Sequence, residues 1–92
     1  MYATSTGANN TALGYQAMVA NTTGARNTSV GQDVLQANTT ANDNTGVGFY
    51  ALNLNTTGTK NTGIGVSALA ANTTGGNNVA IGAESLLSLI HI

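Results

Sequence analysis

A repeat of 17 residues runs through most of the chain and limits what it can fold into. Gly14, Gly31, Gly48, Gly65 and Gly82 follow one another at this interval, with no insertion between them. Each glycine follows a branched or long aliphatic residue, and a second aliphatic column begins at Met18. Short, uniform self-similarity of this kind indicates a solenoid, in which each unit contacts only its neighbours.

The repeat divides the chain into units that begin at Asn10, Asn27, Asn44, Asn61 and Asn78, while residues 1–9 form the back half of an earlier unit. The period is too short for helical hairpins of about 33 residues and too long for a coiled-coil heptad. It fits one coil of a β-solenoid. We therefore expect an all-β fold of stacked 17-residue coils over residues 1–86.

One segment of each unit has the character of a strand. In the second unit it is residues 27–30, and we expect its Val30 to point into the coil. The aliphatic residues before the glycines would then form one interior column, and those that follow the glycines would form another. The first column is Leu13, Val30, Val47, Ile64 and Ile81, and the second is Met18, Leu35, Leu52, Leu69 and Leu86.

The rest of each unit must turn the chain back to the next strand. The repeated glycine would let the backbone turn a corner that a Cβ atom obstructs. The pair Val34-Leu35 lies on another side of the coil, either as a short strand or as a single helical turn. The Asn-Thr-Thr-Gly stretch is typical of a return turn, because Asn tolerates left-handed geometry and Gly supplies positive φ.

A column of asparagines accompanies the stack. Asn10, Asn27, Asn44, Asn61 and Asn78 are predicted to form a ladder in which each carboxamide donates to the next coil. Several asparagines also open glycosylation sequons, which we interpret as a by-product of the repeat. Those sequons begin at Asn9, Asn21, Asn27, Asn38, Asn55 and Asn72.

The few charged residues support the same register. Arg26, Asp43 and Lys60 occupy the last position of consecutive units, so coils stacked about 4.8 Å apart place alternating charges in one column. With only these two cations and a net charge of -1, the chain has little with which to neutralise phosphates. Nucleic acids and anionic membranes are therefore not expected partners.

The sequence carries no pattern for catalysis, a metal or a cofactor. The acidic residues Asp33, Asp43 and Glu84 do not stand at one position in neighbouring units, so no carboxylate pair recurs. His91 has no cysteine or ordered carboxylate beside it, and the chain contains no cysteine at all. We predict no catalytic, cofactor-binding or metal-binding residues, and the protein is not expected to be an enzyme.

A chain of 92 residues with so small an interior is expected to associate. Two aliphatic side chains and an alanine per coil hardly offset the entropy of ordering 17 residues. We predict that the chain associates with copies of itself into a parallel homotrimer. The first and last coils would leave unpaired backbone groups, so we also predict end-to-end stacking of copies.

The repeat stops after Leu86, where residues 87–92 read Leu-Ser-Leu-Ile-His-Ile. This hexapeptide is the translation of CTG TCT CTT ATA CAC ATC, the mosaic-end sequence of a transposon library adapter. We expect this tail to be adapter-derived and the natural repeat to continue beyond it.

Two units indicate a family resemblance. Residues 61–69 and 78–82 read Asn-Thr-Gly-Ile-Gly-Val-Ser-Ala-Leu and Asn-Val-Ala-Ile-Gly. They resemble the head repeats of trimeric autotransporter adhesins, and more closely the Asn-Thr-Ala-Ile-Gly-x-x-Ala-Leu arrays of phage tail fibres. The resemblance covers residues 4–86 and implies three chains of parallel coils around an apolar axis, forming a rigid shaft or receptor-binding head. The unit is longer than that of the adhesin heads around the Ala-Leu pair.

The sequence thus favours a non-enzymatic structural or adhesive segment of an extracellular phage tail fibre or bacterial surface adhesin. Outward Thr and Asn side chains are candidates for contact with a cell-surface glycan. The alternative is an ice-binding solenoid, since low charge and repeated Thr on a flat face can order water. Against it, Thr22 and Thr23 are adjacent and would point to opposite faces of an extended segment.

Overall fold

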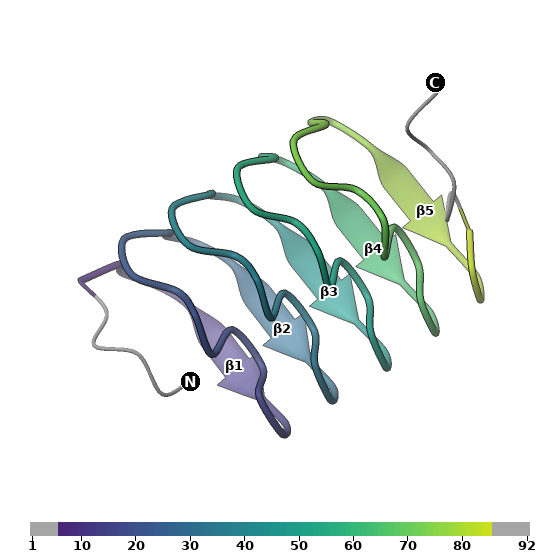
Figure 1. Cartoon of the computed structure of the whole chain (residues 1–92), viewed down its shortest axis with the longest axis horizontal. Coiled ribbons are helices and arrows are strands. Elements are labelled where there is room, and N and C mark those ends of the chain that lie inside the picture. The colour runs from purple at the N-terminus through teal and green to yellow at the C-terminus, as the bar shows by residue number, and fades with distance from the viewer. Residues whose placement is uncertain (1–5, 86–92) are drawn as a thin grey trace.

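The computed structural model describes residues 6–85, which form a parallel β-solenoid of about four turns. Each coil contributes one three-residue strand to a single sheet with the order β1-β2-β3-β4-β5 (Figure 1). The strands are β1 (Thr11–Leu13), β2 (Thr28–Val30), β3 (Thr45–Val47), β4 (Thr62–Ile64) and β5 (Val79–Ile81). The predicted all-β solenoid of about 17-residue coils is confirmed.

The strands pair in the register that the repeat dictates. Thr28 lies opposite Thr45 and Val30 opposite Val47, and the other three pairs of strands follow the same offset. Every position of the repeat therefore forms a column along the stack. The side chains of one column are about 4.8 Å apart, so a property shared by one position becomes a property of a whole face.

The strand aliphatics do not point into the coil, which corrects the sequence-based prediction. Leu13 and Ile81 are 66% and 68% exposed, Ile64 is also exposed, and Val30 and Val47 are half-buried. The inward position of each strand is instead its middle residue. It is buried in β2 to β5 and half-buried in β1, and it is Ala12, Ser29, Gly46, Gly63 or Ala80.

The interior behind the strands has room only for small side chains. A Cβ added to Gly46 would lie 2.6 Å from Val34 Cγ1 of the preceding coil, and one added to Gly63 would lie 3.0 Å from the Ala68 carbonyl oxygen. Where Ser29 occupies the position, its hydroxyl donates to the Val34 carbonyl at 2.9 Å. Because side chains alternate along a strand, a small middle residue inside places the aliphatic residue outside.

The second aliphatic column forms the core of the coil. Met18, Leu35, Leu52 and Leu69 are completely buried, together with Val34, Ala51 and Ala68 beside them. Leu86, which the repeat assigns to the same column, lies outside the described residues, as do residues 1–5 and 87–92. The interior is therefore one line of aliphatic side chains, each packed on those of the next coil.

The backbone that carries the core side chains is neither of the two predicted alternatives, a short strand or a single helical turn. In residues 48–55, three backbone hydrogen bonds join an N–H to the carbonyl three residues earlier. Tyr50 and Leu52 have φ values of 66° and 53°, and the corresponding residues of the other coils are also positive. Positive φ at the third residue of a turn is the geometry of type II, so this side is a run of tight turns.

The repeated glycine lies at the corner between strand and turns. Gly48 has φ 116°, and a Cβ there would lie 2.9 Å from the backbone carbonyl carbon of Gly65 in the next coil. Both its conformation and its contact with the neighbouring backbone exclude a side chain. No helix that could cross a membrane occurs in residues 6–85.

Candidate interaction surfaces

The outer face of the sheet carries two parallel columns of side chains. One is the first strand position, which is Thr in β1 to β4 and Val79 in β5. The other is the aliphatic ridge, which we define as Leu13, Val30, Val47, Ile64 and Ile81. Residues two apart on a strand are roughly 7 Å apart, so the face is a regular array of methyl and hydroxyl groups. No lysine, arginine, aspartate or glutamate occurs in these columns.

The predicted asparagine column binds the stack together, but through the backbone rather than as an amide-to-amide ladder. The carboxamide oxygen of Asn44 accepts a hydrogen bond from the backbone N–H of Asn61 at 3.0 Å, and its Nδ2 donates to the Gly58 carbonyl at 2.8 Å. Asn10, Asn27 and Asn61 make the same two bonds to the coil that follows. Each side chain thus replaces a missing backbone partner at the end of a strand.

The amide ladder lies in the column that sequence reasoning assigned only to the return turn. Asn38 Nδ2 donates to Asn21 Oδ1 at 3.1 Å, Asn55 Nδ2 to Asn38 Oδ1 at 3.1 Å, and Asn72 Nδ2 to Asn55 Oδ1 at 3.0 Å. The second hydrogen of each amide reaches the carbonyl three residues ahead. The repetition of Asn in both columns was visible, but only the direction of each side chain separates the two roles.

Burial of these amides bears on the sequons. Asn21, Asn27, Asn38 and Asn55 are completely buried, and Asn72 nearly so. A glycan on any of them would displace a hydrogen bond that holds neighbouring coils together. Asn9 is the one sequon asparagine exposed within residues 6–85, which agrees with the interpretation of the others as structural.

The charged column has the expected register. Arg26 Nε lies 2.6 Å from Asp43 Oδ1, and Arg26 Nη2 reaches the other carboxylate oxygen at 3.2 Å. The hydrogen bond from Arg26 lowers the pKa of Asp43 against a smaller effect of desolvation, and the same contact raises the pKa of Arg26. Lys60 also lowers the pKa of Asp43 by its charge alone. Both side chains of the pair are partly exposed, so the pair contributes little to stability.

The acidic residues do not assemble into a reactive group. Asp33 and Glu84 lie in the same column of turn residues but three coils apart, and Asp43 belongs to the charged column. Within residues 6–85 no three His, Cys, Asp or Glu side chains are placed to share a metal ion. His91 lies outside this range.

Comparison with known proteins identifies no family for the chain. No protein-family model matches it, and neither a curated protein nor a solved structure shows significant similarity. The fold therefore rests on the periodicity and the coordinates, and the resemblance to adhesin and tail-fibre repeats rests on the residues of the units alone.

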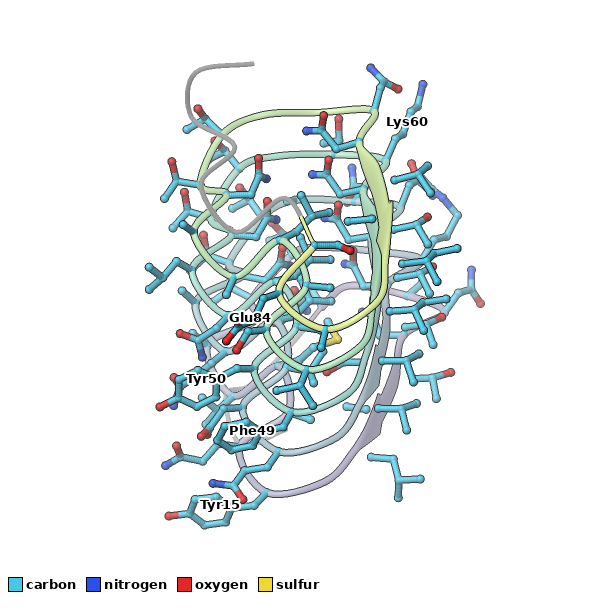
Figure 2. The ribbon with its side chains drawn as sticks, turned by 90° about the vertical axis from the view of Figure 1, so that its right-hand side faces the viewer. Tyr15, Phe49, Tyr50, Lys60 and Glu84 are labelled. Carbon is cyan, nitrogen blue, oxygen red and sulfur yellow. The ribbon has the colours of Figure 1, made fainter. Side chains whose placement is uncertain are left out.

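A corner of aromatic and amide side chains was not anticipated from the sequence. Tyr15 and Phe49 occupy the position directly after the corner glycine, and Tyr50 the position after that. Figure 2 shows all three on one side of the coil, away from Lys60. Their clustering follows from the period of 17, since residues 15 and 49 fall in one column. The signal for this cluster is present in the sequence, at the variable positions of the repeat rather than at its constant ones.

Proposed function

We propose that this chain is a structural segment of a trimeric extracellular fibre or adhesin, of a phage tail or a bacterial surface, without enzymatic activity. The observation that carries the proposal is the aliphatic ridge on the outside of the sheet. A continuous line of five aliphatic residues along one face is typical of a surface that another protein covers. Three parallel copies that turn their ridges towards one axis would bury them together.

The small apolar area that a single chain buries also favours association. The core contains one large aliphatic column, so a single coil buries little apolar surface of its own. Burying the ridge between copies would add a second apolar column without any change in the coil. The absence of charged residues from the ridge and its Thr neighbours suits the centre of an interface, from which charges are depleted. The choice of three copies rests on the resemblance of the units to trimeric repeats.

The hydrogen bonds between coils suit a mechanical role. Backbone and asparagine groups bond neighbouring coils to one another along the stack, and the hydroxyls of Thr22 and Thr56 each add a bond to the next coil. Bending or stretching such a stack requires several of these bonds to lengthen together. The segment would therefore act as a stiff rod that holds a receptor-binding part away from the surface carrying it.

Sedimentation equilibrium tests the proposal. We expect the purified chain to sediment as a trimer, and Val47→Asp to dissociate to a monomer, because the new carboxylate would lie at the apolar axis. Thr57→Asp, which adds the same charge to an exposed return turn, is the matched control and should leave the trimer intact. A stably folded monomeric wild-type chain would count against the proposal.

Ice binding is the second candidate, and the outward threonines of the sheet favour it. The objection from adjacent threonines does not apply to the strands, where Thr28, Thr45 and Thr62 point outward with an aliphatic residue two positions on. The sheet face is thus a regular array of hydroxyl and methyl groups without charge. Such an array can order water, provided that no second copy covers it.

The two candidates use the same face and can be separated. An ice-binding chain should be monomeric and should inhibit ice recrystallisation, and Thr45→Lys should abolish the inhibition without changing the melting temperature. A trimer that leaves recrystallisation unaffected supports the fibre segment. A folded monomer that inhibits recrystallisation would replace the fibre proposal with ice binding.

A further inference from the structure

Every aromatic side chain within residues 6–85 lies at one corner of the coil. Tyr15, Phe49 and Tyr50 are exposed by 62%, 44% and 40%. Phe49 and Tyr50 are the two central residues of a turn, and their rings stack with centroids 4.4 Å apart and planes inclined by 16°. Tyr15 shares the column of Phe49 two coils away, at roughly 10 Å. The corner thus presents aromatic surface on two levels.

Side-chain amides occupy other positions of the same run of turns. Gln36 Nε2 donates to Gln16 Oε1 at 2.6 Å, and Asn53 Nδ2 donates to Gln36 Oε1 at 3.1 Å. Gln32, between Tyr15 and Phe49 in their column, is exposed and donates from Nε2 to Asp33 Oδ2 at a long 3.3 Å. The amides hold one another in place, yet each retains hydrogen-bonding capacity for a ligand.

This composition is confined to the first three coils and is not required by the repeat. At the same turn positions the later coils have Val66, Ser67, Ala83 and Glu84, and beside them Ala70 where Gln36 and Asn53 stand. The backbone of the later turns is nevertheless the same, with positive φ at Ser67 and Glu84. Packing of the coil therefore does not explain why aromatic and amide residues gather here.

Asp33 is the one polar side chain among the described residues with a buried atom that lacks a partner. Its side chain is 7% exposed, and its Oδ1 makes no hydrogen bond. A buried acceptor without a protein donor is costly, and a ligand hydroxyl that reached this oxygen would reduce that cost. Asp33 shares its column with Tyr50 in the next coil, so that donor would arrive beside the aromatic pair.

We propose that this corner, which we call the aromatic corner (Tyr15, Gln16, Gln32, Asp33, Phe49 and Tyr50), is a binding site for neutral glycan chains. Aromatic rings stack on the C–H faces of pyranose sugars, and amides and carboxylates pair with their hydroxyls. An apolar peptide would leave the amides and the carboxylate without partners, and such a mismatch weakens binding. An anionic glycan would meet Asp33 with no cation beside it, since Lys60 lies on the other side of the coil (Figure 2).

The site deepens the adhesive part of the proposed function and rests on it. Binding by a single corner would be weak. Parallel copies in one fibre would present several such corners together, which raises the apparent affinity without new contacts. The two stacking levels, two coils apart, suit a chain of sugars rather than a single one.

Titration of the whole chain with cellohexaose, chitohexaose and maltohexaose tests the site, with hexagalacturonic acid as the anionic comparison. Tyrosine fluorescence and NMR shifts of the aromatic protons report binding. We expect at least one neutral hexasaccharide to bind with a dissociation constant of about 1 mM, and the anionic one to bind at least about tenfold more weakly. Phe49→Leu and Tyr15→Leu, which keep apolar bulk but remove a ring, should each weaken binding about fivefold.

Two further variants complete the test. Asp33→Asn suits the φ of 60° at this position and should also weaken binding, whereas Leu54→Ala, at an exposed apolar residue outside the corner, should not. Failure of every neutral hexasaccharide to bind at about 10 mM overturns the proposal. Binding that the two ring-removing variants leave unchanged overturns it as well.

Sedimentation of the same samples keeps the two proposals apart. A monomer that binds sugar retains the site and refutes the trimer, whereas a trimer that binds no sugar refutes the site alone. If Phe49→Leu dissociates the assembly without affecting any sugar, the corner is a contact between copies and the glycan site is wrong.

Discussion

Individual glycines and asparagines determine how closely the coils can stack. At Gly48 the backbone is left-handed and lies against the backbone of the next coil, so no side chain has room. At Gly46, two residues earlier, the obstacle is instead a methyl group of Val34, and other coils accept Ala or Ser at that position. Gly46 in β3 and Gly48 directly after it are therefore required for different physical reasons.

Gly48→Ala should destabilise the fold much more than Gly46→Ala. The first combines a left-handed alanine with a backbone clash, which together cost about 2–4 kcal/mol, whereas the second requires only that one side chain shift. Urea denaturation of the two variants measures the difference. Equal unfolding free energies would show that the corner is looser than its geometry indicates.

The amide ladder predicts a strong effect of a change by one atom. Asn55→Asp replaces two N–H donors with an oxygen that faces the Asn38 and Gly58 oxygens, at a cost of about 3 kcal/mol. Asn77→Asp makes the same change at an exposed position and is the control. Thermal unfolding at neutral pH should separate the two variants, and an unaltered melting temperature for Asn55→Asp would contradict a buried ladder.

The Arg26–Asp43 pair predicts a small acid sensitivity. Because the pKa of Asp43 is lowered in the folded chain, its stabilising contribution is fully present above the unfolded value of about 3.9 and is lost as pH falls through the folded value. Melting temperatures of wild type and Asp43→Asn should therefore converge slightly between about pH 4 and pH 2. A difference between them that stays constant over this range would exclude the pair as its source.

At the scale of the element, the sequence predicted the period and the stacking correctly but assigned the wrong face of each strand to the interior. The aliphatic residues of Thr-Ser-Val and Thr-Gly-Ile were expected inside because hydrophobic residues usually are. The narrow coil leaves only the space of a small side chain behind the strand, and this depends on how close the opposite turns approach. A single sequence does not contain that distance. It does contain the constant small residue between two larger ones, which is the signal of a tight interior.

The turns that carry the core were equally hard to predict. A leucine at positive φ is unfavourable by itself, so propensity argues against the geometry seen at Leu35, Leu52 and Leu69. Burial of these side chains along a continuous column compensates for that cost. Local preference and packing oppose each other here, and only the assembled stack shows which prevails.

The two aliphatic columns should respond differently to shortening. Leu52→Ala removes a completely buried side chain and should cost the single coil stack about 2–5 kcal/mol. Val47→Ala should change the stability of a dissociated chain by less than about 1 kcal/mol, because its side chain lies outside the core. Unfolding at low protein concentration, where copies separate, makes the comparison. If Val47→Ala costs more than this at low protein concentration, the aliphatic ridge belongs to the core of the single chain.

At the scale of the whole molecule, the coil has an apolar column on each side of its sheet. The inner column is covered by the turns, and the outer one is covered by nothing within residues 6–85. A stiff stack with one apolar face suits parallel association with copies in register, since each coil then meets the same coil of its neighbours. The variable aromatic corner remains outside the aliphatic ridge, where a ligand can reach it.

Cross-linking through single cysteines tests the association of ridges most directly, because the chain has no cysteine of its own. Around a common axis, Val47→Cys should oxidise to a covalent dimer of chains, since equivalent residues would lie within the reach of a disulfide. Thr57→Cys, on the exposed return turn, should remain uncross-linked. If Val47→Cys stays uncross-linked and reacts with maleimide as readily as Thr57→Cys, the ridge is not an interface and the account of its role is wrong.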